Sequence, residues 1–241
     1  MKNKNFFYQQ YNKINWENQE KTKINFFINK FIIRDILSKK KGSGIKIFDI
    51  GFGIGSFIKM LYKELNTMYK DIIIEGCEPS EKNYNYFIKN PLIFRKGMKF
   101  KIYNKIFLNI KTDEKFDFIT AIYVFPHFMS DELEETAKKI NLMLEKNGKF
   151  ILVVANETCL EEKLKSMKDL FIERNFIEFN GKKYKEVLHY SDIPKIGKVI
   201  DYNREEAFYV DLFDKYNLKL TLKKDLEDNS FICTVFVFEK R

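Results

Sequence analysis

The chain has 241 residues, a length that fits one large domain or one domain with an insertion. Hydrophobic residues make up 45% of the chain and charged residues 32%, which excludes disordered and low-complexity classes. The net charge is +9, but residues 1–46 hold most of the excess, with 11 basic and three acidic side chains. No clustered arginine stripe appears, so the charge does not indicate a nucleic-acid-binding surface.

The chain begins with a helical pattern and continues as alternating strands and helices. Apolar residues at near-helical spacing over 5–38 predict an N-terminal helical cap, residues 1–40. Strands are predicted at 45–50, 71–77, 99–103, 116–123 and 147–155. One helix is expected to begin at about residue 56, a second to follow the second strand and end at 86, and a third to span 131–146. Apolar strands that alternate with helices predict an α/β fold with a doubly wound, mostly parallel sheet.

The C-terminal third departs from this rhythm. The runs at 218–224 and 231–239 are strands too close together for a crossover helix, so they predict an antiparallel hairpin that completes a seven-stranded sheet. Residues 158–174 and 203–216 are predicted to be helical. Two strand-like runs flank Asn180 and Gly181, a type I′ turn signal. We therefore expect one domain over 41–241 with an insertion after strand five at about 176–202.

Cysteine content and the chain start bear on the compartment. Cys77, Cys159 and Cys233 are odd in number and widely spaced, which argues against a disulfide or zinc framework. No apolar run approaches the roughly 18 residues of a membrane span, and MKNKNFFYQQ lacks the features of a signal peptide. These observations predict a cytoplasmic protein with reduced thiols and no membrane contact.

A glycine-rich segment, Asp49-Ile-Gly51-Phe-Gly53-Ile-Gly55, joins the first strand to its helix. Glycines there permit positive φ angles and close approach of a ligand to the backbone. The following helix start supplies free N–H groups at the edge where open α/β sheets bind ligands. Glycines also serve tight strand–helix turns, but their concentration here favours a ligand loop.

The type of ligand follows from what surrounds these glycines. A dinucleotide fingerprint needs glycine at the position of Ser56, and no Gly-Lys-Ser/Thr of a P-loop follows. Glu78 ends the second strand, where a carboxylate accepts both hydroxyls of a ribose, so a nucleoside without a pyrophosphate is indicated. Glu75 is the alternative acid, but it lies inside the strand.

Four motifs in this order resemble class I S-adenosylmethionine-dependent methyltransferases. They are D-I-G-x-G-x-G, then EPS after strand two, FDFITA in strand four and NGKFILV in strand five. The terminal hairpin is similar to the sixth and seventh strands of that family. The resemblance covers about residues 40–157 and 203–241, and it implies S-adenosylmethionine as cofactor and S-adenosylhomocysteine as product.

The resemblance also implies roles for individual residues near the cofactor. Asp49 orients the methionine amino end, the three loop glycines line the methionine and ribose, and Glu78 with the adjacent Pro79 holds the ribose. Asn104 matches the position that bonds adenine, although the usual residue there is Asp. The remaining implied cofactor contacts are Ile122 and Tyr123 after strand four and Tyr11 from the N-terminal helices.

His127 is the candidate catalytic residue. It follows strand four in YVFPHF, and its ordinary pKa suits a general base near neutrality. The alternative is that His127 only packs between Phe125 and Phe128. Pro126 replaces a Glu that is common in the family, so we expect no acid–base pair within this segment.

The insertion supplies candidate substrate residues. The stretch from His189 to Arg204 concentrates polar side chains, and insertions after strand five commonly cover the substrate in similar enzymes. Arg204 could bind a phosphate or carboxylate bidentately, or it could be an exposed first-turn arginine. The candidates are His189, Tyr190, Tyr202 and Arg204.

These observations predict a methyltransferase that acts on oxygen or nitrogen of a small, anionic molecule. The sequence of residues 189–206 resembles that of capsule and surface-glycan methyltransferases of bacteria, which suggests a surface-polysaccharide precursor as acceptor. The alternatives are a tRNA or rRNA methyltransferase and a non-catalytic cofactor-binding protein. No His and carboxylate cluster is apparent, so we expect no metal. The acceptor, its atom and the oligomeric state stay open.

Overall fold

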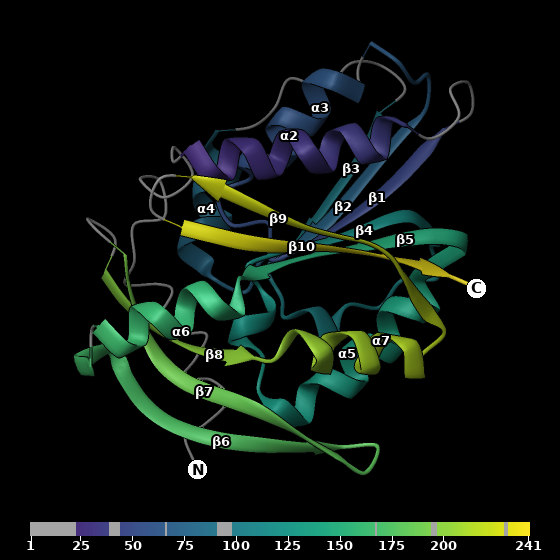
Figure 1. Cartoon of the computed structure of the whole chain (residues 1–241). Coiled ribbons are helices and arrows are strands. Elements are labelled where there is room, and N and C mark those ends of the chain that lie inside the picture. The colour runs from purple at the N-terminus through teal and green to yellow at the C-terminus, as the bar shows by residue number, and fades with distance from the viewer. Residues whose placement is uncertain are drawn as a thin grey trace.

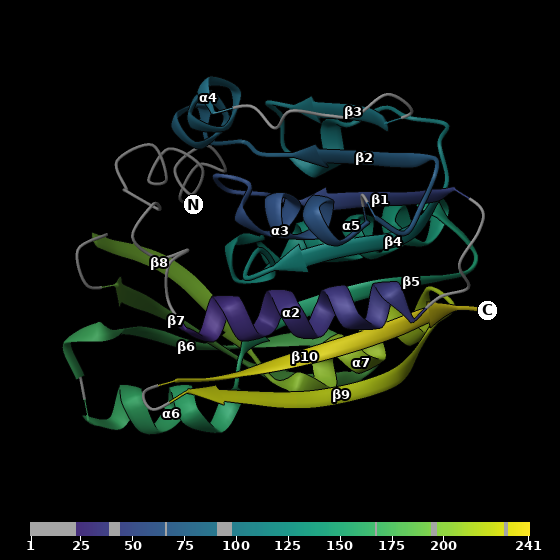
Figure 2. The ribbon, with the colours of Figure 1, turned by 90° about the horizontal axis from the view of Figure 1, so that it is seen from above.

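A seven-stranded sheet forms the centre of the molecule (Figures 1 and 2). The computed structural model describes residues 23–38, 44–65, 67–90, 98–166, 168–193, 197–228 and 231–241. The strand order is β3-β2-β1-β4-β5-β10-β9, and β1 to β5 are parallel. The strands are β1 (Ile45–Ile50), β2 (Ile72–Cys77), β3 (Met98–Tyr103), β4 (Phe116–Ile122), β5 (Leu144–Ala155), β9 (Leu218–Asp228) and β10 (Phe231–Lys240).

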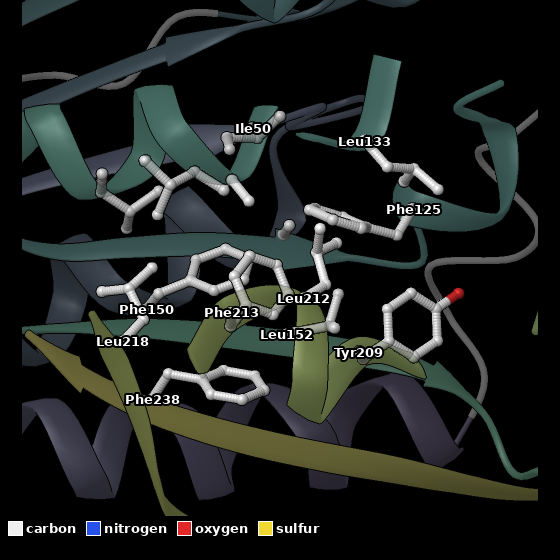
Figure 3. Packing of buried hydrophobic residues seen from close by; sticks show 14 of the residues in the cluster. Ile50, Phe125, Leu133, Phe150, Leu152, Tyr209, Leu212, Phe213, Leu218 and Phe238 are labelled. Carbon is white, nitrogen blue, oxygen red and sulfur yellow. The ribbon is translucent and has the colours of Figure 1, made fainter. Parts of the chain in front are cut away.

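Helices cover both faces of this sheet, as a doubly wound fold requires. One face packs against α2 (Lys23–Leu37), α3 (Ser56–Leu65) and Phe87 of α4 (Glu81–Lys89). The opposite face packs against α5 (Ser130–Met143) and α7 (Glu206–Lys215). Figure 3 shows this second layer, where Phe125, Phe150 and Phe213 lie together between sheet and helices. Buried aromatic residues therefore lie in both cores, one on each face of the sheet.

The predicted fold class is confirmed. The five parallel strands lie within three residues of their expected bounds, and β9 and β10 form the expected antiparallel hairpin. β10 also pairs antiparallel with β5 and so joins the hairpin to the parallel strands. Because all parallel strands run the same way, the segments after β1, β2 and β4 meet at one edge of the sheet.

The insertion is a three-stranded antiparallel sheet and is longer than expected (Figure 1). Its strands are β6 (Phe171–Phe179), β7 (Lys182–Ile193) and β8 (Gly197–Arg204). Asn180 and Gly181 have φ angles of 50° and 73°, which fits the predicted type I′ turn. The unpredicted strand is β8, which pairs with β7 over its whole length.

Two predicted helix boundaries were wrong around this insertion. The helix expected at 158–174 is α6 (Glu157–Ser166) followed by one 3₁₀ turn, and β6 begins at Phe171. The helix expected from 203 begins at Glu206, because residues up to Arg204 belong to β8. The charged residues of these segments are compatible with either a helix or a strand. The segments form strands because they pair with β7.

The N-terminal cap is described only in part. α2 lies along the helical layer beside α3, and its residues Ile28, Ile32, Ile33 and Ile36 are buried in the core. Residues 1–22, which include most of the predicted cap, lie outside the described residues. Within the described ranges, no helix is long and apolar enough to cross a membrane.

Candidate functional site at the carboxyl edge of the sheet

The glycine loop after β1 has the backbone that its sequence predicts. Gly51, Gly53 and Gly55 have φ angles of 66°, 58° and 82°. The N–H of Gly51 donates to the Cys77 carbonyl at 2.8 Å, which fixes the loop to the end of β2. A Cβ on Gly55 would lie 2.1 Å from the Phe87 ring, so packing as well as conformation requires glycine there.

Glu78 ties the end of β2 to this loop. Its Oε2 accepts the N–H of Gly53 at 2.9 Å, and its Oε1 accepts the N–H of Ser80 at 2.8 Å. The residue is only 6% exposed. Burial raises the pKa of Glu78 to about 7, while the two N–H donors and the charge of His127 act in the opposite direction. The carboxylate predicted to hold a ribose is therefore buried beside the glycine loop.

Asn104 and Pro79 shape the segment that carries Glu78. The Asn104 side-chain amide donates to the Glu78 carbonyl at 2.8 Å and to the Pro79 carbonyl at 3.5 Å. Asn104 is exposed and follows β3, so it links the ends of β2 and β3. Its amide nitrogen holds the protein backbone, a role that an Asp at this position would not perform, since carboxylates only accept.

Asp49 is a second buried acid at this edge. It is 3% exposed, and its Oδ1 accepts the Thr120 hydroxyl at 2.6 Å from the neighbouring strand β4. Burial raises the pKa of Asp49 to about 7, the Thr120 bond lowers it, and the nearby Glu78 raises it further. Glu75 differs, because it accepts the Tyr103 hydroxyl at 2.8 Å inside the sheet. Glu78, just after β2, therefore acts electrostatically on Asp49 near the end of β1.

The end of β4 adds a strained residue to the same edge. Tyr123 has a φ angle of 57°, a left-handed conformation that is uncommon for a residue with a side chain. Its N–H donates to the Val153 carbonyl at 2.9 Å, which holds it between β4 and β5. Ile122, the preceding residue, is half-buried. Strained residues of this kind gather at ligand sites because the surrounding structure must over-determine them.

His127 ends the 3₁₀ turn Phe125–His127 and meets the insertion. Its Nδ1 lies 2.8 Å from Oδ1 of Asp201, a residue of β8. Asp201 is paired in register with His189 of β7. His189 is 3% exposed, and burial lowers its pKa while the negative charge of Asp201 raises it. The predicted catalytic histidine and one predicted substrate residue therefore converge on the same carboxylate.

Asp201 was not assigned a role from the sequence. It lies in the polar stretch of the insertion, but so do several other acids and amides. The signal that distinguishes Asp201 is the β7–β8 register, and β8 itself was not predicted. A strand prediction through residue 204 would have placed Asp201 opposite His189, since antiparallel neighbours share a face of the sheet.

The Arg204 guanidinium is buried and bonded to other residues of the protein. The residue is 1% exposed, and its Nε lies 2.6 Å from Oε2 of Glu186, its neighbour in register on β7. Its two Nη groups donate to the carbonyls of Phe125 and Phe128 at 3.2 and 2.8 Å. Glu186 also accepts the Ser130 hydroxyl at 2.9 Å. The guanidinium therefore docks the insertion against the segment that carries His127.

The other predicted substrate residues, Tyr202 and Tyr190, are both in the insertion. Tyr202 is partly buried, with its ring 4.8 Å from the Arg204 guanidinium carbon. Tyr190 is partly buried between two small apolar clusters of the insertion. Tyr11 lies outside the described residues. No group of three His, Cys, Asp or Glu residues in the described ranges is placed to hold a metal.

Comparison with known proteins gives a family and several similar structures. The sequence profile of a family described as a methyltransferase domain matches residues 16–221. No curated protein sequence matches the chain.

Each similar structure has low sequence identity to this chain. Magnesium protoporphyrin IX methyltransferase from Synechocystis, with bound S-adenosylmethionine, has 10% identity, a TM-score of 0.68, and covers 100% of this chain and 98% of that chain. An S-adenosylmethionine-dependent methyltransferase from Clostridium acetobutylicum has 16% identity and a TM-score of 0.62, and covers 98% of both chains. The N-methyltransferase NodS from Bradyrhizobium japonicum, with S-adenosylhomocysteine, has 11% identity, a TM-score of 0.63, and covers 99% and 98% of the two chains.

Proposed function

The chain belongs to the methyltransferase-domain family, and from that premise we propose that it transfers the methyl group of S-adenosylmethionine to an oxygen or nitrogen of a small molecule. The observation that carries this proposal is the arrangement at the carboxyl edge of the sheet. The glycine loop, Glu78 and Tyr123 lie around the end of β1. His127 lies in the 3₁₀ turn that follows the adjacent strand β4.

The residues present fit this cofactor. Each oxygen of the Glu78 carboxylate accepts one backbone N–H, and an ionised carboxylate has about four acceptor sites. The Asn83 side chain also bonds this carboxylate, which leaves acceptor capacity for a ribose hydroxyl. The left-handed backbone at Gly51, Gly53 and Gly55 lets the chain pass close to a ligand without a Cβ in between. Asp49 comes just before the loop and is bonded by Thr120, and Ile122 and Tyr123 at the end of β4 would border the ligand.

When bound, S-adenosylmethionine supplies a methyl carbon activated by a sulfonium. The chain's own residues then need to hold the acceptor in line with that carbon and to receive a proton where the acceptor carries one. His127 carries an imidazole, a side chain able to take up that proton, and it follows β4 at the carboxyl edge of the sheet. The insertion sheet, docked on the same rim by Arg204, acts as the substrate cap.

A small acceptor is supported by the kind of insertion present and by the similar structures. The cap is one three-stranded sheet, and the similar structures include methyltransferases named for a protoporphyrin and a glycopeptide. Arg204, from which an anionic acceptor was inferred, is occupied by Glu186 and two carbonyls. The anionic acceptor and the surface-polysaccharide precursor stay predictions, as does metal independence.

Calorimetric measurement of S-adenosylmethionine affinity in variants of Glu78 and Glu75 tests the cofactor assignment. Glu78→Gln should weaken binding of S-adenosylmethionine by about 10- to 100-fold, the effect of losing a charged acceptor. Glu75→Gln is the matched control, because Glu75 is equally buried three residues earlier but accepts Tyr103 inside the sheet. Equal affinities in wild type and Glu78→Gln would contradict the assignment.

Turnover tests the enzymatic part separately. The wild-type protein would be incubated with S-adenosylmethionine carrying a ¹³C-labelled methyl group and with a small-molecule extract of cells. We expect labelled product and S-adenosylhomocysteine in equal amounts. Cofactor binding without any labelled product, small or macromolecular, would favour the non-catalytic alternative, and label in RNA would favour the nucleic-acid alternative.

A further inference from the structure

The contact between His127 and Asp201 joins two parts of the chain that are 74 residues apart in sequence. His127 Nδ1 and Asp201 Oδ1 are 2.8 Å apart, and the two side chains are 17% and 13% exposed. A contact this short is favourable when the imidazole carries a proton on the nitrogen that faces the carboxylate, because two lone pairs would repel. A carboxylate only accepts, so Nδ1 of His127 is the group of this pair that can donate.

The ionisable groups near Asp201 and His127 are His189, Lys163 and Glu78. The cross-strand neighbour of Asp201, His189, is buried, which lowers the pKa of His189 and favours its neutral form. Lys163 of α6 and His127 also lower the pKa of His189. On the other side, a protonated His127 lowers the pKa of Glu78, so its charge reaches the cofactor edge. His127 thus lies between a carboxylate of the insertion and a carboxylate of the predicted ribose site.

The backbone of His127 is fixed by the same strand. Arg204, three residues after Asp201 on β8, donates to the carbonyls of Phe125 and Phe128, which flank His127. The guanidinium is held in turn by Glu186 at 2.6 Å. One strand therefore fixes both the main chain and the ring of His127. A histidine that only filled space between phenylalanines would not need a carboxylate at its ring nitrogen.

We propose that Asp201 is the positioning residue of His127 and that the pair serves an acceptor hydroxyl, whose proton must be removed for methyl transfer. This inference rests on the proposed methyltransferase function and names the substrate class of the same site. With Nδ1–H bound to Asp201, the His127 ring presents an unprotonated Nε2 to the acceptor. A carboxylate in this position fixes the tautomer and stabilises the imidazolium once it forms.

The proton and electron pairs balance in this step. The acceptor O–H bond breaks and its proton goes to Nε2 of His127, while an oxygen electron pair forms the new bond to the methyl carbon. The bond between that carbon and sulfur breaks, and its electron pair stays on sulfur. The imidazolium next to Asp201 then loses its proton to water. An amine acceptor that reacts from its neutral form would not need the base before transfer.

Nitrogen NMR of the histidine rings tests the positioning role without turnover. The chain has only two histidines, so His189→Gln assigns both sets of ring signals in protein labelled with ¹⁵N-histidine. In neutral wild-type protein, His127 should carry its proton on Nδ1. Asp201→Asn should remove that preference, because the amide can donate to Nδ1 and favour the Nε2–H form. Asp201→Glu should restore it in part.

Glu178→Gln is the matched control for the same chemical change. Glu178 is an exposed acid of β6 in the same small sheet, 73% exposed and 3.4 Å from Lys183. It should leave the His127 ring signals and turnover unchanged. A wild-type His127 protonated on Nε2, or an unaltered tautomer in Asp201→Asn, would overturn the positioning role even if S-adenosylmethionine binds normally.

The ¹³C-methyl product tests the acceptor class. Its carbon chemical shift distinguishes a methyl on oxygen from one on nitrogen, and we expect oxygen. With that product's precursor as acceptor, Asp201→Asn should lower kcat by about 10²-fold, the lower range for general-base catalysis, with KM and cofactor affinity little changed. Methyl on nitrogen or carbon would overturn the hydroxyl assignment. Failure of the wild type to bind S-adenosylmethionine would overturn the proposed function itself, and this inference with it.

Discussion

Two regions of the molecule bury carboxylates, and they do so in opposite ways. In the insertion, Glu186 is paired with Arg204 at 2.6 Å and a hydroxyl supplies a further bond. At the cofactor edge, Asp49 and Glu78 are each bound by neutral donors, and neither forms an ion pair with another described residue. Burial raises the pKa of both to about 7.

The difference separates a structural use of charge from a ligand-binding use. A carboxylate fully engaged by a guanidinium fixes the shape of the cap and has little left to offer a ligand. A carboxylate held by two N–H groups keeps acceptor sites for a ligand, but the apo protein bears the desolvation cost of its charge. The following predictions test this contrast, beginning with the largest effect.

Arg204→Met should cause the largest loss of stability. It leaves Glu186 buried without its cation and removes the donors of two buried carbonyls. Breaking one partner of a buried ion pair costs about 3–5 kcal/mol. Chemical denaturation at pH 7.5 measures the loss. In the double variant Glu186→Met/Arg204→Met most of it should return, since both charges are removed. A single variant within about 1 kcal/mol of wild type would show that the pair is not desolvated.

A matched pair of glycines compares the backbone of the two regions. Gly55 in the cofactor loop and Gly181 in the insertion hairpin have similar φ angles of 82° and 73°. A Cβ on Gly181 meets no atom within 4 Å, whereas on Gly55 it would lie 2.1 Å from the Phe87 ring. Gly181→Ala should therefore cost only the left-handed conformation, about 1–2 kcal/mol. Gly55→Ala should cost about 1–3 kcal/mol more for the displaced ring.

Stability and cofactor affinity both check this second prediction. Thermal unfolding gives the difference between the two alanine variants. Gly55→Ala should also weaken binding of S-adenosylmethionine, because the loop that bonds Glu78 must move, while Gly181→Ala should not. Equal stability losses in the two variants would mean that the Phe87 ring rotates away without cost.

The sequence predicted the cofactor edge far better than the cap. The residues of that edge lie at the last positions of a strand or just after it, and parallel strands bring their ends together whatever the detail of packing. The bonds of Asp201 and Arg204 instead depend on β8, whose pairing with β7 decides which side chains face each other. Periodicity in a short, charged segment does not determine that register, because strand preference depends on tertiary context.

Side-chain partners were also beyond what local pattern could predict. Arg204 follows Tyr202 and Asn203 in a stretch that reads as a helix start, which suggested an exposed position. Its burial results from carbonyls that lie 76 and 79 residues away. In contrast, Glu78 accepts the N–H of Ser80 only two residues later, which is a local contact.

The two unpaired acids should make the apo protein less stable as pH rises. Their folded pKa of about 7 lies above the unfolded values of 3.8 and 4.5, so the folded state binds more protons between these limits. Their contribution is fully present below about pH 4 and is lost as pH rises through 7. Each acid changes the free energy of unfolding by up to about 1.4 kcal/mol per pH unit.

Measurements between pH 6.5 and 8 isolate this effect from His189. The lowered pKa of His189 acts in the opposite direction, but only below its unfolded value of 6.5. In this window Glu78→Gln should reduce the slope of unfolding free energy against pH, and S-adenosylmethionine, which favours the ionised carboxylate, should reduce it as well. An equal slope in wild type and variant would show that Glu78 is ionised throughout the window.

Asn104→Ala should have the smallest effect and tests whether neutral bonds alone shape the cofactor edge. The substitution removes one hydrogen bond from the side-chain amide to the Glu78 carbonyl, which should weaken S-adenosylmethionine binding by about 0.5–1 kcal/mol, or about 2- to 5-fold, because the Glu78 segment is held less firmly.

Asn104→Asp distinguishes this support from direct contact with adenine. A carboxylate cannot donate to the Glu78 carbonyl, so Asp should lower apo stability at least as much as Ala. If Asn104 contacts the adenine amino group, however, Asp should bind the cofactor better than Ala, because it keeps an acceptor there. Equal calorimetric affinities for the two variants would leave Asn104 with the backbone-supporting role alone.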